Sequence, residues 1–495
     1  MNTYELISFI AYFVLVIGVG IFFFLKSRLS GGEKEYFLGG RNMGGWVAAL
    51  SAGASDMSAW VLMGLPGSIY LYGIGQVWIS MGLWIGTILS WVFIAPRLRR
   101  YSIAANDSIT IPQFLNNRFL SGSRTLQIIS AVVFLVVYTV YAASSIYACG
   151  TLFNTVMGLD PRIAMVGAAV IILIYTFLGG FNAVCWTDFF QGMLMLAALL
   201  VAPIVAVFIM NFGEFTAPAV ALGDNYYNLL SSGAFDWKSL SDILTGLGWG
   251  LGYFGMPHIL IRYMSIRSEK EMKKSRRVGI MWTTLILIFA SVAAIIGRQF
   301  LGDALVENGS SQVFIFIVRD LFPGLIAGVL LSAILAASMS TADSQLLASS
   351  SAFASDIYKP VFRKKASEKE MLWAGRLIVV VISVVALLVA MSPRCAGIMA
   401  LVECAWGAFG AAFGPVMILS LFWKRFTYKG AVASMVAGFL TDALWYVFLS
   451  ESTGLYEIIP GFIVGLIAAV VVSLIDKAPS KEVTDLFDKA KEPTD

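Results

Sequence analysis

The chain has 495 residues, of which 59% are hydrophobic and only 13% are charged, and its formal net charge is +4. A soluble protein is usually about 45–50% apolar and about 25% charged. A mean hydropathy of +0.82 is too high for a soluble domain with a buried core, so we predict that the lipid bilayer is the solvent. The four cysteines have no CxxC or other metal-binding spacing, and we predict no disulfide framework.

The N-terminal stretch MNTYELISFIAYFVLVIGVGIFFFL lacks a basic start and a clear cleavage site, so we predict a retained membrane helix rather than a removed signal peptide. Twelve further apolar stretches are long enough to cross a membrane, which takes about 20 residues in a helix. The thirteen predicted spans are 4–25, 44–72, 77–96, 126–150, 161–178, 184–210, 241–261, 278–297, 324–355, 371–391, 397–423, 430–449 and 456–475.

Lysine and arginine cluster after the first, third, seventh, ninth and eleventh predicted spans, and the loops after even-numbered spans are poor in both. Cytoplasmic loops of membrane proteins carry the excess of positive charge. We therefore predict a multi-pass protein of the cell membrane with its N-terminus outside and its C-terminus inside. The tail, residues 477–495, is predicted to be a short, polar and mobile cytoplasmic end.

Two predicted spans are unusually rich in glycine, with the sequences GGWVAALSAGASDMSAWVLMGLPG and LTGLGWGLGYFGMPHIL. Interrupted helices are tolerated at membrane depth where they line a cavity, and secondary transporters place solute and ions at such breaks. Close packing of glycine faces is the alternative explanation. Because the two segments lie five spans apart, we predict an inverted repeat in which each segment opens a five-helix unit.

This repeat divides the chain into five parts. They are a leading helix and loop (1–43), a first repeat (44–213), a second repeat with the preceding outer loop (214–423), two trailing helices (424–476) and the tail (477–495).

Five acidic residues lie alone in predicted spans, namely Asp56, Asp188, Asp343, Glu403 and Asp442. Placing a charge inside a membrane costs free energy, so we treat each of these residues as a candidate functional residue. No lysine or arginine is predicted to lie comparably deep, so the interior favours a cation. Asp56 is the best candidate because it lies at a predicted break, Asp188 is assigned to an inner exit path and Asp442 to a structural role, and Glu403 has no assigned role.

A face of small and hydroxyl residues accompanies Asp343. Ala337, Ser340, Thr341 and Ser344 fall at positions i, i+3, i+4 and i+7 of one helix. A carbonyl with hydroxyls on one face predicts half of a Na⁺ site, and ordinary helix packing is the alternative.

Aromatic residues lie in the spans that are predicted to line the cavity. Trp60, Tyr141, Trp249 and Tyr253 could hold an ammonium group and an aliphatic ring together. The single histidine, His258, is assigned a structural role, with proton coupling or gating as the alternative.

These residues resemble a known family. The motifs LSAGASDMSAWVLMGLPG, TFLGGFNAVCWTD, GWGLGYFGMPHIL, LLSAILAASMST, CAWGAFGAAFGP and KRFTYKGA are similar to those of the sodium/solute symporter family over essentially the whole chain. The pair SAGASDMS and GWGLGYFG is typical of its proline-transporting branch. The resemblance implies an all-α membrane protein with the LeuT-type 5+5 inverted repeat, one leading helix and two trailing helices.

The resemblance also implies site residues. A sodium site would use the backbone carbonyls of Ala54 and Met57 with Ala337, Ser340 and Thr341, and Asp56 would either bind the ion or act from behind the ligands. The inner ion pathway would contain Asp188, with Ser344 and Asp343 nearby. The solute-binding residues would be Ser58, Trp60, Tyr141, Trp249, Tyr253 and Pro257. Asp343 and Glu403 depart from the family pattern, where smaller or hydroxyl residues are expected.

The function that this resemblance implies is Na⁺-coupled uptake of L-proline by alternating access, by a protein expected to be a monomer and not an enzyme. Pantothenate or a related imino or amino acid, and coupling to protons or lithium, remain alternatives. A cation channel would need a continuous pore, and an enzyme would need a catalytic constellation such as HExxH or GxSxG, neither of which occurs in the sequence.

Overall fold

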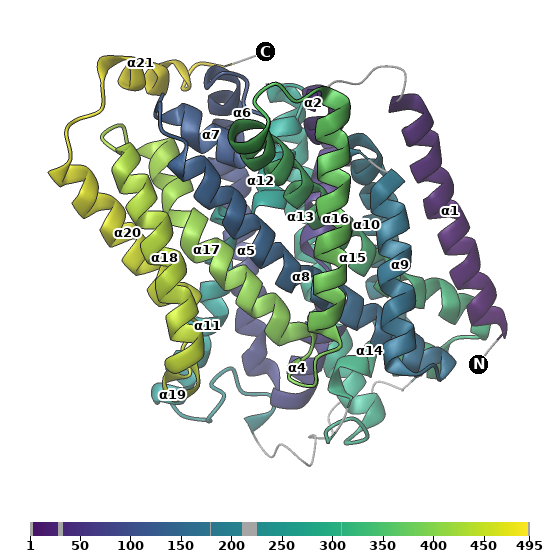
Figure 1. Ribbon diagram of the computed structural model, residues 1–495. Coiled ribbons are helices and arrows are strands. Elements are labelled where there is room, and N and C mark those ends of the chain that lie inside the picture. The colour runs from purple at the N-terminus through teal and green to yellow at the C-terminus, as the bar shows by residue number, and fades with distance from the viewer. Residues whose placement is uncertain (1–2, 28–32, 179, 210–224, 308, 494–495) are drawn as a thin grey trace.

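The protein is described by a computed structural model that covers residues 3–27, 33–178, 180–209, 225–307 and 309–493 (Figure 1). Within these ranges it is all-helical, and an isolated β-bridge between Met43 and Ile266 is the nearest approach to a strand. Figure 1 shows a bundle with two ends. We call the end at which α1 (Thr3–Ser27) begins the N-side, and the end that carries α21 (Lys481–Lys489) the C-side.

Ten helices among the described residues are long and apolar enough to cross a membrane. They comprise α1, α5 (Val77–Leu89) continued by α6 (Ala95–Ala104), α8 (Thr125–Met157), α10 (Phe181–Ile209), α13 (Glu269–Leu301), α15 (Gly324–Ser351), α16 (Glu368–Ala390), α17 (Ile398–Phe422), α18 (Tyr428–Phe448) and α20 (Ile458–Ile475). The helix α9 (Pro161–Leu178) has a shorter apolar stretch.

The two glycine-rich segments, together with α9, account for the difference between ten helices and thirteen predicted spans. Each glycine-rich segment is divided into two shorter helices, α3 (Gly45–Asp56) with α4 (Leu65–Tyr72), and α11 (Trp237–Gly248) with α12 (Pro257–Ser265). Every predicted span therefore coincides with helix in the structure. The number of crossings and the sides of the termini stay predictions.

Short helices cover both ends of the bundle. The C-side carries α2 (Glu33–Leu38), α7 (Ile111–Arg118) and α21, and the N-side carries α14 (Val313–Leu321) and α19 (Ser450–Thr453) (Figure 1). The expectation of a mobile polar tail is wrong for the residues that form α21. This helix is amphipathic, and it buries Val483 and Phe487.

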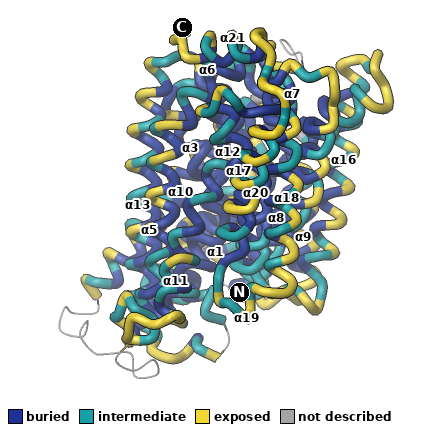
Figure 2. Tube along the Cα trace, turned by 90° about the vertical axis from the view of Figure 1, so that its left-hand side faces the viewer, coloured by how far each residue is buried: buried dark blue, intermediate teal, exposed yellow. Residues whose placement is uncertain are grey.

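The helices separate into a central and a peripheral set (Figure 2). In the most apolar stretches of α15 and α17, 83% of the residues are buried, compared with 28% in α1, α16 and α18. Apolar side chains on the peripheral helices have no partner to cover them inside the protein, as expected for lipid-facing helices. The central helices α15 and α17 therefore form the surfaces against which the broken helices pack.

Candidate ion and solute site

The first helix break begins at Asp56. The chain leaves the helix at Met57 and Ser58 and resumes with a single π-helical turn, Trp60–Gly64, which leads into α4. The backbone carbonyl of Asp56 accepts hydrogen bonds from the backbone N–H of Ser58 at 2.9 Å and from Nε1 of Trp60 at 3.2 Å. All of these residues are buried, so the break is an ordered feature of the interior.

The second break is held by the central helix α17. After α11 the chain forms a tight 3₁₀ segment, Trp249–Phe254, and α12 starts only at Pro257. Nε1 of Trp406 in α17 donates a hydrogen bond to the backbone carbonyl of Trp249 at 2.7 Å. A Cβ atom at Gly252 would lie 2.0 Å from this nitrogen, so only glycine allows the indole to approach.

The side chains of the two breaks meet. The hydroxyl of Tyr253 donates a hydrogen bond of 2.5 Å to Oδ2 of Asp56, and the rings of Trp60 and Trp249 lie 6.1 Å apart. The second carboxylate oxygen of Asp56 is buried and has no hydrogen-bond partner among the described residues. Asp56 therefore connects the two broken segments through Tyr253 and keeps one oxygen available.

Neutral oxygens gather between the first break and α15. Oγ of Ser340 donates to the carbonyl of Ala54 at 2.8 Å and also lies 3.1 Å from the carbonyl of Ala337. The next residue, Thr341, has a buried hydroxyl without a partner in the described part of the chain. Oxygen atoms are the ligands that hard cations take, so carbonyls and hydroxyls at this point suit an ion such as Na⁺. The structure thus brings together three of the five predicted sodium ligands.

The predicted solute residues lie around the same two breaks. The ring of Trp249 lies tilted beside that of Trp60, and the ring of Tyr253 lies 5.3 Å from that of Trp406. Oγ of Ser58 lies 3.4 Å from the backbone nitrogen of Trp60. These aromatic and hydroxyl groups line the junction of the breaks from both segments.

Tyr141 reaches the second break from α8. Its ring lies 6.3 Å from the ring of His258, which follows Pro257 directly. The hydroxyl of Tyr141 is buried and has no hydrogen-bond partner among the described residues. Nδ1 of His258 lies 3.2 Å from the hydroxyl of Tyr138, an arrangement consistent with the structural role assigned to this histidine. Tyr141 therefore places a buried hydroxyl near the start of α12.

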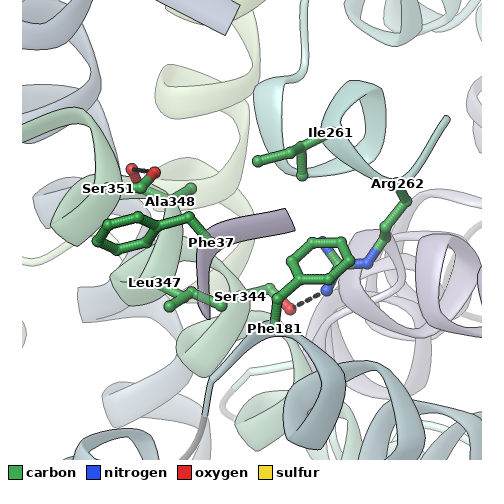
Figure 3. Close-up of a pocket in the computed structure, with 8 residues that line it drawn as sticks. All are labelled: Phe37, Phe181, Ile261, Arg262, Ser344, Leu347, Ala348 and Ser351. Carbon is green, nitrogen blue, oxygen red and sulfur yellow. Dashed lines mark hydrogen bonds between the residues drawn. The ribbon is translucent and has the colours of Figure 1, made fainter. Parts of the chain in front are cut away.

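A charged network lies on the C-side of the two breaks. Arg262 of α12 donates to Oδ2 of Asp188 at 2.8 Å, to Oγ of Ser51 at 2.7 Å and to the carbonyl of His258 at 2.6 Å. It also donates to Oγ of Ser344, as Figure 3 shows. The network joins α3, α10, α12 and α15. The expectation that no basic residue lies as deep as the acidic ones is therefore wrong, because Arg262 is buried and neutralises Asp188.

The space beside this network is almost filled by side chains. A cavity of about 10 Å³ lies between Arg262, Phe181, Ser344, Phe37 and the residues around them (Figure 3). A water molecule needs about 10–15 Å³ of such space. Of the residues predicted for the inner pathway, Ser344 lines this narrow cavity, and the assignment of the pathway stays a prediction.

The N-side is open by comparison. A cavity of about 500 Å³ extends over Trp249, and its outer wall includes the exposed ring of Tyr72. We call this cavity the vestibule. Glu403 lies in its wall. Among the described residues, a wide cavity therefore lies on the N-side, and only narrow space lies beside Arg262 on the C-side.

Two other lone carboxylates have different surroundings. Oδ1 of Asp343 lies 3.4 Å from the hydroxyl of Ser344, beside the C-side network. Asp442 is buried in α18 against α17.

Sequence reasoning missed Trp406 and Arg262 as site residues. Trp406 stands in the motif CAWGAFG, whose small residues indicate a packed helix face, and this context could have identified it. Arg262 stands in the apolar run PHILIRYM, four residues after His258, where a charge needs a partner. Its position near the end of a span led to its assignment to the following loop.

Comparison with known proteins places this geometry in context. The model of the sodium:solute symporter family matches residues 36–438. The chain is 41% identical to the osmoregulated proline transporter OpuE of Bacillus subtilis, over 98% of each chain. It is 43% identical to the high-affinity proline transporter PutP of B. subtilis, over 92% of this chain and 95% of the relative. It is 42% identical to the sodium/proline symporter of Escherichia coli, over 99% and 97%.

Solved structures show the same fold. A Na⁺-coupled sialic acid symporter in a substrate-bound outward-open state aligns with a TM-score of 0.81 at 20% identity, over 97% of this chain and 99% of that one. Mhp1, a nucleobase-cation-symport-1 family transporter, aligns with a TM-score of 0.54 at 15% identity, over 92% and 98%. At these identities the likeness concerns the fold alone.

Proposed function

Because this chain belongs to the sodium:solute symporter family, we propose that it couples the uptake of L-proline to the entry of Na⁺ by alternating access. The observation that carries the proposal is the group of oxygens formed by Ala54, Ala337 and Ser340 at a helix break. Three relatives that are 41–43% identical over almost the whole chain are named as proline transporters, which supports proline as the solute.

Sodium binds first in the proposed cycle. The carbonyls of Ala54, Met57 and Ala337 and the hydroxyls of Ser340 and Thr341 hold the ion. Asp56 acts from behind these ligands, because its carboxylate bonds to Tyr253 and its negative potential favours the cation. Binding of the ion would fix the first break against α15. Since Tyr253 is attached to Asp56, the same event orders the second break.

Proline then binds between the two breaks. Its carboxylate lies toward Ser58 and the start of the helical turn at Trp60, where N–H groups and the helix dipole favour an anion. The rings of Trp60, Tyr141, Trp249 and Tyr253, together with Pro257, enclose the pyrrolidine ring. Binding of the solute therefore requires that the two broken segments are well ordered, and the bound ion stabilises these same segments.

Alternating access follows from the arrangement of the two ends. We assign the N-side to the outside and the C-side to the cytoplasm, in line with the positions of the basic residues. The repeats formed by residues 44–213 and 214–423 then move against each other, and the network of Arg262 opens. Asp188, Ser344 and Asp343 line the path by which the ion leaves. We propose a monomer of thirteen spans in the lipid bilayer.

The ion gradient can sustain accumulation. A potential of about 100 mV supplies roughly 2.3 kcal/mol per charge, and a tenfold gradient supplies roughly 1.4 kcal/mol. With one Na⁺ per proline, the sum corresponds to an accumulation on the order of several hundred-fold.

Uptake of radiolabelled L-proline by proteoliposomes tests the proposal. An inward Na⁺ gradient should drive accumulation, and equal Na⁺ on both sides should abolish it. Accumulation without Na⁺ would contradict the coupling. If proline is not taken up but pantothenate, or a related imino or amino acid, is taken up with Na⁺, the solute assignment is wrong and the coupling to Na⁺ stands.

The ion site has its own test. Ser340→Ala removes a hydroxyl that contacts two carbonyls, and loss of one such ligand, at about 1–3 kcal/mol, should raise the Na⁺ concentration for half-maximal uptake by about tenfold or more. The matched control is Ser338→Ala. Ser338 is equally buried in α15, but its hydroxyl donates to the carbonyl of Ile334 in its own helix and not to the first break. If both variants keep the Na⁺ dependence of the wild type, the assignment is wrong.

A further inference from the structure

The vestibule is a polar chamber with one charged wall residue. Its volume of about 500 Å³ is several times that of an amino acid. Glu403 is the one residue with a charged side chain among those that line it, in the described part of the chain. Other hydroxyl and amide residues also line this space, namely Ser68, Tyr72, Gln76, Tyr147, Thr245, Ser310 and Ser311. This lining suits a small polar ligand that carries positive charge.

Glu403 lines the vestibule together with Trp249. Its backbone carbonyl accepts a hydrogen bond of 2.8 Å from the hydroxyl of Tyr456, and the ring of Tyr456 lies 5.2 Å from that of Trp249. Trp249 forms the floor of the vestibule, and it also belongs to the junction between the two helix breaks. The carboxylate of Glu403 makes no hydrogen bond or ion pair with any described residue. A ligand bound to Glu403 would therefore lie on the N-side of the proposed solute pocket, with Trp249 between them.

Two further carboxyl groups lie near Glu403. One turn along α17, a Cβ atom at Gly407 would lie 2.9 Å from Oδ1 of Asp442 and 3.4 Å from Oε1 of Glu457. Both oxygens are buried and lack hydrogen-bond partners in the described part of the chain. Arg394 lies in the wall of a neighbouring cavity of about 180 Å³ and does not line the vestibule. The cluster therefore lacks a basic partner on the vestibule side.

We propose that the vestibule is a first binding site for the ammonium group of the solute, with Glu403 as its counter-charge. An ammonium group that leaves bulk water is stabilised by an opposite charge within a few ångströms. The hydroxyl and amide groups of the opposite wall provide donors for the solute carboxylate. The solute then passes Trp249 into the pocket between the breaks. The identification of the solute as proline rests on the proposed function, whereas the cation-binding property of the vestibule does not.

Thiol labelling measures the electrostatics of the vestibule without transport. In a background in which the four native cysteines are replaced by serine, Met399→Cys places a reporter thiol in the vestibule wall. A cationic and an anionic methanethiosulfonate reagent of similar size are compared with and without Glu403→Gln. A unit charge about 6 Å away should change the ratio of their rates by about tenfold, in favour of the cation when Glu403 is present.

Uptake kinetics measure the role of the same carboxylate. Glu403→Gln should raise the KM for proline several-fold and leave kcat unchanged, and Glu403→Asp should restore part of the affinity. Pyrrolidine, which is a cation with the ring of proline but no carboxylate, should inhibit uptake by the wild type several-fold better than uptake by Glu403→Gln. The control is Glu451→Gln, which removes an exposed charge from the same end of the molecule, on α19.

The outcomes separate the two proposals. Equal reagent ratios in the presence and absence of Glu403, with equal inhibition by pyrrolidine, would overturn the vestibule site even if proline is transported. A shifted reagent ratio without any proline uptake would support the cation site and contradict proline as the solute. A change of the same size in Glu451→Gln would show a general surface effect and would also overturn the proposal.

Discussion

At the C-side, Arg262 ties four helices together through charged hydrogen bonds, whereas at the N-side the side chain of Trp249 separates vestibule from pocket and meets its neighbours through ring contacts. The ring of Trp249 lies 6.1 Å from Trp60, 6.2 Å from Trp406 and 5.2 Å from Tyr456. Charged hydrogen bonds are strong and require narrow geometry, while aromatic rings keep favourable contact over centroid distances of about 4.5–7 Å. We infer that the C-side has two states, in which the hydrogen bonds of Arg262 are either all formed or all broken, and we call this network the C-side latch. The rings around Trp249, in contrast, can shift gradually to fit a solute.

The difference has a consequence for the cycle. Breaking the network of Arg262 leaves two charges to be solvated, so opening of the C-side requires water to enter with it. Movement of the rings around Trp249 leaves no unpaired charge. Entry from the N-side should therefore be easy and exit on the C-side should be the controlled step.

The largest effect is expected from Arg262→Gln. Removal of one partner of a buried ion pair costs about 3–5 kcal/mol, because Asp188 is left buried and unpaired. The C-side should open, and a reporter cysteine at Ala348, which lines the cavity in Figure 3, should react with thiol reagents from the C-side about 100-fold faster. The measurement uses inside-out vesicles and the cysteine-free background.

A double variant provides the control for this latch. Asp188→Asn with Arg262→Gln removes both charges and should be more stable to heat than Arg262→Gln alone. If the reporter at Ala348 reacts at the wild-type rate in Arg262→Gln, Arg262 does not close the C-side.

The next effect concerns the N-side floor. Trp249→Ala removes the ring that contacts three aromatic neighbours, and loss of such an anchor, at about 2 kcal/mol, should raise the KM for proline about 30-fold. Trp249→Phe should retain most of the affinity, because the floor tolerates changes of ring geometry. Trp237→Ala is the control, since this tryptophan is exposed on the same side. Equal losses for Ala and Phe would contradict the idea of an adjustable floor.

The sequence predicted the breaks better than the closure. Glycine-rich runs mark both broken segments, and the period of the helix places Ala337, Ser340 and Thr341 on the side of α15 that meets Ala54. These are local properties. The partners Asp188 and Arg262 are 74 residues apart, and no pattern within one segment shows that they meet.

Trp406 and the tail were missed for a related reason. Trp406 acts through one long-range hydrogen bond to the carbonyl of Trp249, which is invisible to periodicity. The tail helix is only nine residues long, and its two buried residues, Val483 and Phe487, are too few to outweigh its polar composition. A helix of this length is stabilised by docking rather than by its own sequence.

A smaller effect should follow from weakening this docked helix on the C-side. Phe487 is buried and lies under the guanidinium groups of Arg97 and Arg118, at 5.3 and 5.1 Å from its ring centre. Burial of a phenylalanine side chain contributes about 1.5–3 kcal/mol. Phe487→Ala should therefore release α21, and hydrogen exchange of residues 481–489 should become faster by about tenfold or more.

The tail variant also sharpens the comparison of the two ends. Asp485→Ala is its control, because Asp485 is exposed on the same helix. If release of α21 speeds labelling of the reporter at Ala348, the tail belongs to the C-side latch. Unchanged labelling would confine the latch to the network of Arg262.

The smallest effect is a pH-dependent one at the C-side surface. Burial opposes ionisation of Asp107, but hydrogen bonds from Lys34 and Arg41 outweigh it and hold the pKa of this carboxyl below its ordinary value of about 3.9. A depressed pKa in the folded state means that ionised Asp107 stabilises the fold above the ordinary pKa. This stabilisation is lost as the pH falls through the lowered value.

Asp107→Asn should therefore lower the melting temperature at pH 7 by only about 1 °C, because the side chain is partly exposed. Asparagine tolerates the left-handed backbone at this position, where φ is +48°, so the change tests the charge and not the turn. The difference between the two proteins should shrink below about pH 4 and vanish once the pH has fallen through the lowered pKa of the wild-type carboxyl. A difference that persists or grows in acid would mean that the pairing with Arg41 does not hold the C-side loop.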